Sequence, residues 1–194
     1  MKKILIATKN RDKFTIVKEI LDNLNKGEYE YYSLHDVNGI SKEDNEYGSI
    51  QDRAYNKAKM VFDSVQNETY EYVVGVDDGI EMKGILRENV KDYISDILAD
   101  RYLLNGEKVN IVRAYCFIKN DGEIKETVTN IPFVYHKSNK HVCIEENSYP
   151  LGNVLCPLDS DVSVSNMSNS DCNEYYIKYS CEPLTKVLKE EVRC

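Results

Sequence analysis

The N-terminal segment constrains the fold most, because a buried strand and an amphipathic helix follow each other within it. The stretch KKILIAT at residues 2–8 has the apolar composition of a buried strand. Apolar residues then recur at helical spacing between Phe14 and Leu24. A polar turn at residues 8–10 separates the two patterns. We therefore expect a strand, a turn and a helix in this order, which is typical of α/β proteins.

The alternation of strand and helix patterns continues along the chain. The stretch YEYYSL at residues 29–34 is a strand candidate, and apolar positions over residues 50–65 predict a second helix. The stretch YEYVVGVDDGIEM at residues 70–82 predicts a strand that is broken by a turn at residues 77–79. These elements favour a sheet that is covered by helices.

The second half of the chain adds a hairpin and a terminal helix. A third helix is expected over residues 90–98, and residues 109–135 predict two strands on either side of the turn NDGE. Residues 160–173 are rich in Ser, Asn and Asp, and we expect a loop there. Pro183 fits the first turn of a short terminal helix.

Together, these patterns predict an α/β fold with three layers (α/β/α), a mixed central sheet and a long β-hairpin lobe. The chain has 194 residues, of which 42% are hydrophobic, and this suits one domain over residues 1–194. The hairpin would divide that domain into two lobes around a central cleft. In such sheets, ligands bind where loops leave the strand ends.

The composition excludes several classes of function. A formal net charge of -8 argues against a duplex nucleic acid partner, although a local site for a small anion stays open. The apolar run ILIA near the N-terminus is too short for a signal peptide or a membrane span, so we expect a cytoplasmic protein with no membrane partner. The six cysteines contain no C-x-x-C pair, which argues against a zinc site or a disulfide framework.

The first polar turn, ATKNRDK, has the features of a phosphate site. A helix N-terminus after a strand presents free backbone N–H groups and the positive end of the helix dipole. Thr8 and Asn10 can donate hydrogen bonds, and Lys9 and Lys13 supply positive charge. A solvated basic turn capped by Asn10 would have the same sequence, so the turn alone leaves both interpretations open.

The second polar turn, VDDGIE, has the features of a magnesium site. Asp77 and Asp78 follow an apolar strand, and Mg²⁺ prefers carboxylate and phosphate oxygens as ligands. One carboxylate could also accept a proton from an attacking water. The alternative is an exposed Asp-Gly turn. Between the two turns, Glu46 precedes a helix, and Lys57 lies at the edge of its apolar face, where a surface lysine is the other interpretation.

Three motifs occur in a familiar order: T-x-N-x-x-K, then I-x-x-R-A-x-x-K-A, then V-V-G-V-D-D-G-I-E. This order resembles the Ham1-like inosine triphosphate pyrophosphatase family, and the resemblance covers most of residues 1–123. It implies an enzyme that hydrolyses ITP, XTP or their deoxy forms to the monophosphate and pyrophosphate. It also implies Mg²⁺ as a cofactor and a homodimer as the assembly.

The resemblance assigns roles to individual residues. Asp77 and Lys57 would be catalytic, with Asp77 as metal ligand or general base and Lys57 on phosphate. The triphosphate would lie on Thr8, Lys9, Asn10 and Lys13, the base near Tyr149, Lys178 and Tyr179, and the metal on Glu46, Asp77 and Asp78.

The sequence departs from the family pattern at several of these positions. Arg53 stands where the middle motif has Asn, and Asp78 replaces a Ser. The Ser-His-Arg motif that reads the base would fall at residues 178–180, which are Lys, Tyr and Ser. Two further hypotheses therefore stay open. One is an inosine/xanthosine triphosphate phosphatase, which releases phosphate; the other is a protein that binds a nucleotide without hydrolysing it.

Overall fold

The fold was analysed in a computed structural model, which describes residues 1–37, 47–65, 70–137 and 151–189. The strands are β1 (Lys2–Ala7), β2 (Tyr29–Ser33), β3 (Tyr72–Met82), β4 (Ile85–Arg87), β5 (Lys108–Lys119), β6 (Ile124–Tyr135) and β7 (Leu155–Cys156). The α-helices are α1 (Arg11–Asn25), α2 (Ile50–Ser64), α3 (Ile94–Leu98) and α4 (Asn169–Lys189), and two short 3₁₀ helices span Val90–Asp92 and Val164–Asn166.

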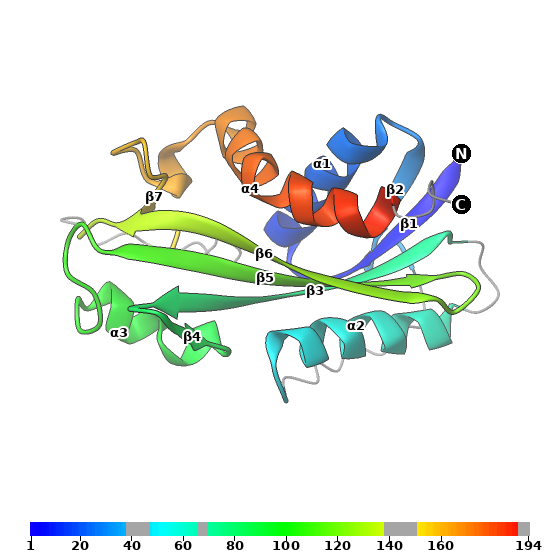
Figure 1. The fold of residues 1–194 in the computed structure, drawn as a ribbon, viewed down its shortest axis with the longest axis horizontal. Coiled ribbons are helices and arrows are strands. Elements are labelled where there is room, and N and C mark those ends of the chain that lie inside the picture. Colours follow the sequence, from blue (N-terminus) through cyan, green and yellow to red (C-terminus); the bar gives the residue numbers. More distant parts are fainter. Residues whose placement is uncertain (38–46, 66–69, 138–150, 190–194) are drawn as a thin grey trace.

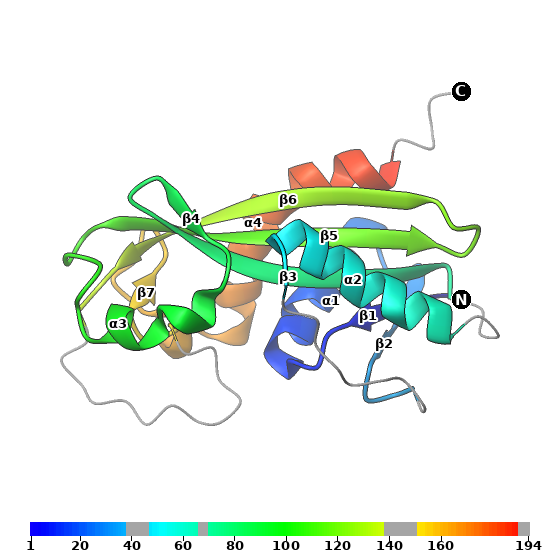
Figure 2. The ribbon, with the colours of Figure 1, turned by 90° about the horizontal axis from the view of Figure 1, so that it is seen from below.

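The seven described strands form one mixed sheet in the order β2-β1-β3-β5-β6-β7, with β4 beside the far end of β3. Strand β1 is parallel to β2 and β3, and the other pairs are antiparallel. Helices α1 and α4 cover one face, and α2 covers the other (Figures 1 and 2). The predicted three layers, the mixed sheet and the long hairpin of β5 and β6 are confirmed.

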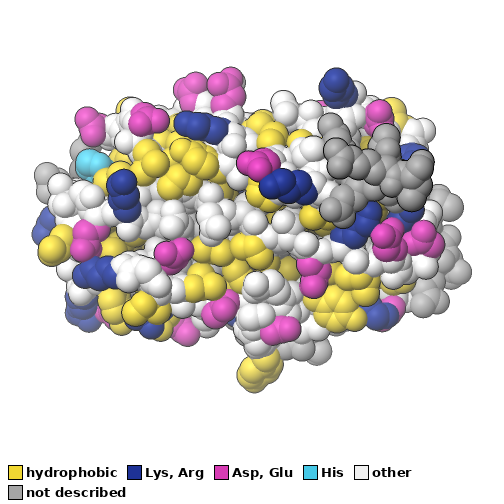
Figure 3. Space-filling view, viewed as in Figure 1, with side chains coloured by type: hydrophobic (Ala, Val, Ile, Leu, Met, Phe, Trp, Pro, Cys, Tyr) yellow, Lys and Arg dark blue, Asp and Glu magenta, His cyan; other side chains and the backbone are white. Residues whose placement is uncertain are grey.

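Each face of the sheet has its own hydrophobic core, because successive side chains of a strand point to opposite faces. Ile4 and Ile6 of β1 pack toward α1 and α4, and Leu5 and Ala7 pack toward α2. Charged residues of both signs are interspersed on the surface visible in Figure 3. In the part of the chain that the structure describes, no helix is both long and apolar enough to cross a bilayer.

Strand β3 has a short unpaired stretch on one edge, and this stretch positions the candidate site. On that edge, β1 pairs with β3 only as far as Gly75, and β4 pairs only from Ile80 onward. Residues 76–79 therefore have no strand partner on this side within the described parts of the chain. On the other edge, β5 pairs with β3 over its full length.

Two of the predicted turns are wrong. No turn breaks the strand at residues 77–79, since β3 runs to Met82 and the chain reverses at Lys83 and Gly84, where φ is 54° and 75°. Pairing with β5 keeps residues 77–79 extended. Likewise, Pro183 lies inside the 21-residue α4 and not in a first turn. The helix begins earlier because Ser168 Oγ accepts a hydrogen bond from the backbone N–H of Asp171, 3.1 Å away.

Two further expectations are partly confirmed. The helix predicted over residues 90–98 is divided into the 3₁₀ helix Val90–Asp92 and α3. The loop predicted over residues 160–173 contains the 3₁₀ helix Val164–Asn166, and its last residues belong to α4. The strand at Tyr29–Ser33 and the helix that begins at Ile50 are as expected.

Candidate functional site

The first polar turn connects the end of β1 to the start of α1, as predicted. Asn10 caps the helix, because its side chain accepts a hydrogen bond from the backbone N–H of Lys13 at 2.9 Å. The backbone N–H of Asn10 in turn donates to Thr8 Oγ1 at 3.3 Å. Lys9 lies in the same turn, where its backbone oxygen is 3.3 Å from His35 Nε2. The turn is therefore shaped by hydrogen bonds of its own residues.

Helix α2 lies unusually close to β3, and Gly75 makes this approach possible. A Cβ atom at Gly75 would be 1.9 Å from the backbone oxygen of Ala54. Without a side chain at this position, the backbones of helix and strand come into direct contact. Ser49 and Asp52 fix the start of the helix with a capping box. As a result, Arg53 and Lys57 are held over the unpaired stretch of β3.

Two cationic side chains of α2 contact the carboxylate of Asp77. Arg53 Nε donates to Asp77 Oδ2, and Lys57 Nζ lies 3.1 Å from Asp77 Oδ1. The Arg53 guanidinium also donates to the backbone oxygen of Gly48 at 3.0 Å and to that of Glu88. Arg53 thus joins Asp77, the segment before α2 and the segment after β4.

Asp78 points to the opposite face, where α1, β5 and α4 supply its surroundings. Arg113 Nε and Nη2 lie 2.7 Å and 3.1 Å from its two carboxylate oxygens, and Lys13 Nζ lies 3.1 Å from Oδ2. The ring of Tyr176 covers the Arg113 guanidinium at 5.4 Å. The side chains of Asp78 and Arg113 are only 8% and 4% exposed, so this ion pair is buried.

Lys13 connects the two carboxylates, since its Nζ also lies 3.8 Å from Asp77 Oδ1. We call the six side chains of Lys13, Arg53, Lys57, Asp77, Asp78 and Arg113 the β3 charge cluster. It contains four basic and two acidic groups, so positive charge is in excess. The side chains of Lys13 and Lys57 are the most exposed of the six, at 16% and 18%.

The local electrostatics favour ionised carboxylates. Burial acts to raise the pKa of Asp77, but the positive charges of Lys57, Lys13 and Arg53 outweigh it, so the pKa is lowered. The pKa of Asp78 is lowered well below its ordinary value, because attraction to Arg113 and Lys13 outweighs burial. Burial lowers the pKa of Lys13 despite the neighbouring carboxylates. Both aspartates are therefore acceptors of hydrogen bonds at neutral pH.

The described carboxylates do not fit a resident magnesium ion. All four oxygens of Asp77 and Asp78 already face a Lys or Arg nitrogen, and a divalent cation here would be repelled by four positive groups. Within the described ranges, no group of three or more His, Cys, Asp or Glu side chains could hold a metal. Glu46, the third predicted ligand, lies outside the described residues.

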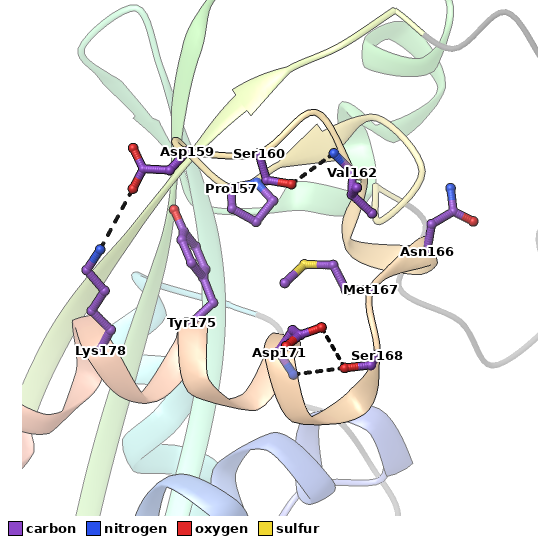
Figure 4. A pocket seen from close by; sticks show the side chains of 10 residues that line it. All are labelled: Pro157, Asp159, Ser160, Val162, Asn166, Met167, Ser168, Asp171, Tyr175 and Lys178. Carbon is purple, nitrogen blue, oxygen red and sulfur yellow. Dashed lines mark hydrogen bonds and ion pairs between the residues drawn. The ribbon is translucent and has the colours of Figure 1, made fainter.

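Of the three residues predicted to contact the base, the structure describes Lys178 and Tyr179, and both belong to α4. Lys178 belongs to α4 and lines a cavity of about 500 Å³ between this helix and the segment that follows β7 (Figure 4). Tyr179 packs against Tyr175, with 5.1 Å between the ring centroids. No member of the β3 charge cluster lines this cavity. Tyr149 lies outside the described residues.

Sequence reasoning did not single out Arg113 of the cluster as a site residue, nor Tyr176, whose ring covers the Arg113 guanidinium. A signal for Arg113 is present, because an arginine inside the apolar strand VNIVRAYCF must find a buried partner. Tyr176 carries no such signal, since α4 is rich in tyrosine. Arg53 is visible in the sequence as a departure from the family pattern, and the structure shows its partner to be Asp77.

Comparison of the sequence with protein-family models and with curated proteins finds no match. Solved structures do match, over 98% of this chain and 100% of each of theirs. The Ham1 protein of Staphylococcus aureus matches with a TM-score of 0.64 at 14% identity, and the HAM1 protein of Coxiella burnetii with 0.63 at 12%. The nucleoside-triphosphatase / dITP/XTP pyrophosphatase of Mycobacterium abscessus matches with 0.58 at 16%.

This chain has the Ham1 fold. The sequence resemblance, which rests on three short motifs, is confirmed at the level of the fold. At identities of 12–16%, the shared fold does not by itself assign the activity, and the chemistry must be argued from the residues of this chain.

Proposed function

We propose that the protein hydrolyses nucleoside triphosphates at a phosphoanhydride bond and releases the monophosphate and pyrophosphate. The observation that carries this proposal is the β3 charge cluster, in which four basic groups surround two carboxylates beside the N-termini of α1 and α2. An excess of positive charge beside helix N-termini attracts a phosphate chain. The Mycobacterium abscessus protein with the same fold is described as a dITP/XTP pyrophosphatase, which supports the choice of reaction.

The cluster supplies the groups that phosphoryl chemistry requires. A lysine ammonium has three N–H donors, and Lys57 directs one to Asp77, so the others can contact phosphate oxygens. Lys13 is placed to do the same from α1, with Thr8 and Asn10 at the helix N-terminus. These contacts would neutralise the charge that develops on the phosphate oxygens. Thr8, Lys9, Asn10, Lys13 and Lys57 are therefore the proposed triphosphate contacts.

Asp77 is the proposed catalytic carboxylate. It is ionised at neutral pH, because the surrounding positive charges lower its pKa. A low pKa makes it a weak base, so its proposed role is to accept a hydrogen bond from the attacking water and orient it. Lys57, at 3.1 Å, holds one carboxylate oxygen in place. Asp78, paired with Arg113 on the other face, positions Lys13.

The proposed substrates are the purine nucleotides ITP, XTP and dITP, on the basis of the fold and the sequence motifs. Lys178 lines a cavity that contains no residue of the β3 charge cluster, and Tyr179 packs against Tyr175. Their assignment to the base stays a prediction, as does that of Tyr149. The cytoplasmic location and the homodimer also stay predictions, and sedimentation equilibrium of the purified chain tests the latter.

Product analysis tests the proposed reaction. Purified protein is incubated with ITP, XTP, dITP, dUTP and the four common ribonucleotides, each with Mg²⁺ and with EDTA. Chromatography then resolves monophosphate, diphosphate, pyrophosphate and phosphate. We expect monophosphate and pyrophosphate from ITP or XTP. Diphosphate and phosphate would indicate the phosphatase alternative, and no turnover of any substrate would overturn the hydrolase proposal. The predicted requirement for Mg²⁺ is measured in the same assay.

A further inference from the structure

The acidic groups of the β3 charge cluster are already neutralised by the protein. On Asp77, Lys57 Nζ faces Oδ1 at 3.1 Å and Arg53 donates to Oδ2. On Asp78, Arg113 Nε and Lys13 Nζ face the two oxygens at 2.7 Å and 3.1 Å. The negative charge of both carboxylates is thus already balanced by the protein, so a metal ion beside them would gain little attraction and would be repelled by the neighbouring cations.

Arg53 is the decisive member of this arrangement. Its side chain is only 6% exposed, and its nitrogens contact Asp77, the backbone oxygen of Gly48 and that of Glu88. These three partners come from separate segments of the chain and fix the guanidinium in one orientation. The guanidinium is always protonated, so it places a permanent positive charge against Asp77.

The cluster also retains capacity to bind an anion. Lys13 and Lys57 are partly exposed and have N–H donors beyond those directed at the aspartates. The two lysines therefore offer donors of hydrogen bonds, and the cluster has an excess of positive charge, both of which suit phosphate oxygens.

We propose that this protein binds the phosphate chain of its substrate without a resident divalent metal ion, because Arg53 neutralises Asp77 where a metal would otherwise be needed. This inference rests on the proposed function, since it concerns the same phosphate site. It distinguishes binding from hydrolysis: a metal ion that arrives with the nucleotide can still take part in the reaction, but the protein does not require one to hold the phosphates.

Calorimetric titration with inorganic tripolyphosphate tests the inference. The probe has the phosphate chain without a base, and the titration is run in EDTA and then with Mg²⁺ in excess over the probe. We expect the wild-type protein to bind in EDTA, with a dissociation constant within about threefold of the value in Mg²⁺. Binding that occurs only with Mg²⁺ would overturn the inference.

Two substitutions at Arg53 sharpen this test. Arg53→Asn removes the charge beside Asp77, so binding in EDTA should weaken at least tenfold, as expected for loss of a charged partner. Mg²⁺ should then restore part of the affinity. Arg53→Lys keeps the charge and should bind in EDTA within about threefold of wild type. Equal binding of tripolyphosphate by Arg53→Asn and wild type in EDTA would contradict the role of Arg53.

Arg101→Asn is the matched control, because Arg101 is 72% exposed and pairs only with Asp96 among the described ion pairs. It should bind as wild type does in both buffers. Thermal melts establish that each variant is folded, and the wild-type comparison alone decides the inference if Arg53→Asn does not fold.

The outcomes also separate this inference from the proposed function. Metal-independent binding of tripolyphosphate without turnover of any nucleotide would overturn the hydrolase proposal and support the inference. Turnover accompanied by binding that needs Mg²⁺ would support the hydrolase and overturn the inference. Failure to bind in either buffer would overturn the inference, and the product analysis would then decide the function independently.

Discussion

The β3 charge cluster and the cavity beside α4 differ in how their charged residues are held. The cluster draws on α1, α2, β3 and β5, and none of its side chains is more than 18% exposed. The cavity is lined by one continuous part of the chain, residues 157–178, and two of its three charged residues, Asp159 and Lys178, are 86% and 59% exposed. Charges that four different elements bring together are buried by the fold, whereas those of one continuous segment stay exposed to solvent.

The sign of the charge also differs between the two regions. Basic groups outnumber acidic groups in the cluster, while the cavity is lined by Asp159, Asp171 and a single lysine. A polyphosphate is attracted to the first region and repelled by the second. We therefore expect the phosphate chain to bind at β3 and not in the cavity of about 500 Å³ beside α4, and matched substitutions in the two regions test this expectation.

The largest effect is expected for Asp77→Asn. The change removes the carboxylate that orients the attacking water, so turnover should fall by about 10³-fold, within the usual range for such groups. The turnover number is measured on the best substrate of the product analysis, with circular dichroism to confirm the fold. Asp159→Asn, the matched change in the cavity, should leave turnover within about twofold. Unchanged turnover in Asp77→Asn would show that Asp77 has no catalytic role.

The next largest effect is expected on stability, for Asp78→Asn. Asp78 forms a buried ion pair with Arg113, and removing one partner leaves an uncompensated charge, so the free energy of unfolding should fall by about 3 kcal/mol. Urea unfolding measures this change. Asp171→Asn, at the start of α4, should cost less than about 1 kcal/mol. Similar losses in both variants would show that the buried ion pair of Asp78 contributes no more to the free energy of unfolding than Asp171 does.

The same pair predicts a pH dependence of stability. Because the pKa of Asp78 is lowered on folding, its stabilisation is complete above the ordinary value of about 3.9 and is lost as the pH falls below it. Wild-type protein should therefore lose more stability than Asp78→Asn between about pH 4 and pH 2. Parallel losses in urea unfolding across this range would contradict the lowered pKa.

A smaller effect is expected for Lys13→Ala. The substitution removes one of the accessible ammonium groups, so the affinity for tripolyphosphate should fall by roughly tenfold. Calorimetric titration provides the measurement. An affinity that stays within twofold of wild type would show that the phosphates do not reach α1.

The smallest effect is expected for Lys178→Ala, which is the counterpart of Lys13→Ala in the cavity. Lys178 is 59% exposed and lies 4.0 Å from Asp159, so its charge is screened by solvent and by the carboxylate. Tripolyphosphate affinity should change by less than about twofold. A loss of affinity as large as that of Lys13→Ala would indicate that the phosphate chain binds in the cavity and not at the β3 charge cluster.

The fold was predictable where local pattern and packing agree. β1, α1, α2 and the hairpin all follow from periodicity and turn residues close to them in sequence. The continuity of β3 did not follow, because the residues that stabilise Asp77 and Asp78 are distant. Lys57 precedes Asp77 by 20 positions, and Arg113 follows Asp78 by 35. Two aspartates before a glycine therefore predicted a turn that long-range ion pairs and pairing with β5 prevent.

The candidate site was predictable in part for the same reason. The sequence identified Lys13, Lys57 and Asp77, which the structure brings together, because each belongs to a motif with a fixed spacing. The sequence predicted Asp78 as a metal ligand, whereas in the structure its carboxylate forms an ion pair with Arg113. The predicted base-contacting residues could not be placed from spacing alone. Lys178 and Tyr179 lie in α4, which begins ten residues before Tyr179. The hydrogen bond at Ser168 that starts this helix was not recognised in the sequence.

The most direct test of the account is a crystal structure with a non-hydrolysable ITP analogue. We expect the phosphate chain to lie between Lys13 of α1 and Lys57 of α2, within hydrogen-bond distance of both ammonium groups. A phosphate chain bound in the cavity beside α4, with the β3 charge cluster unoccupied, would contradict it.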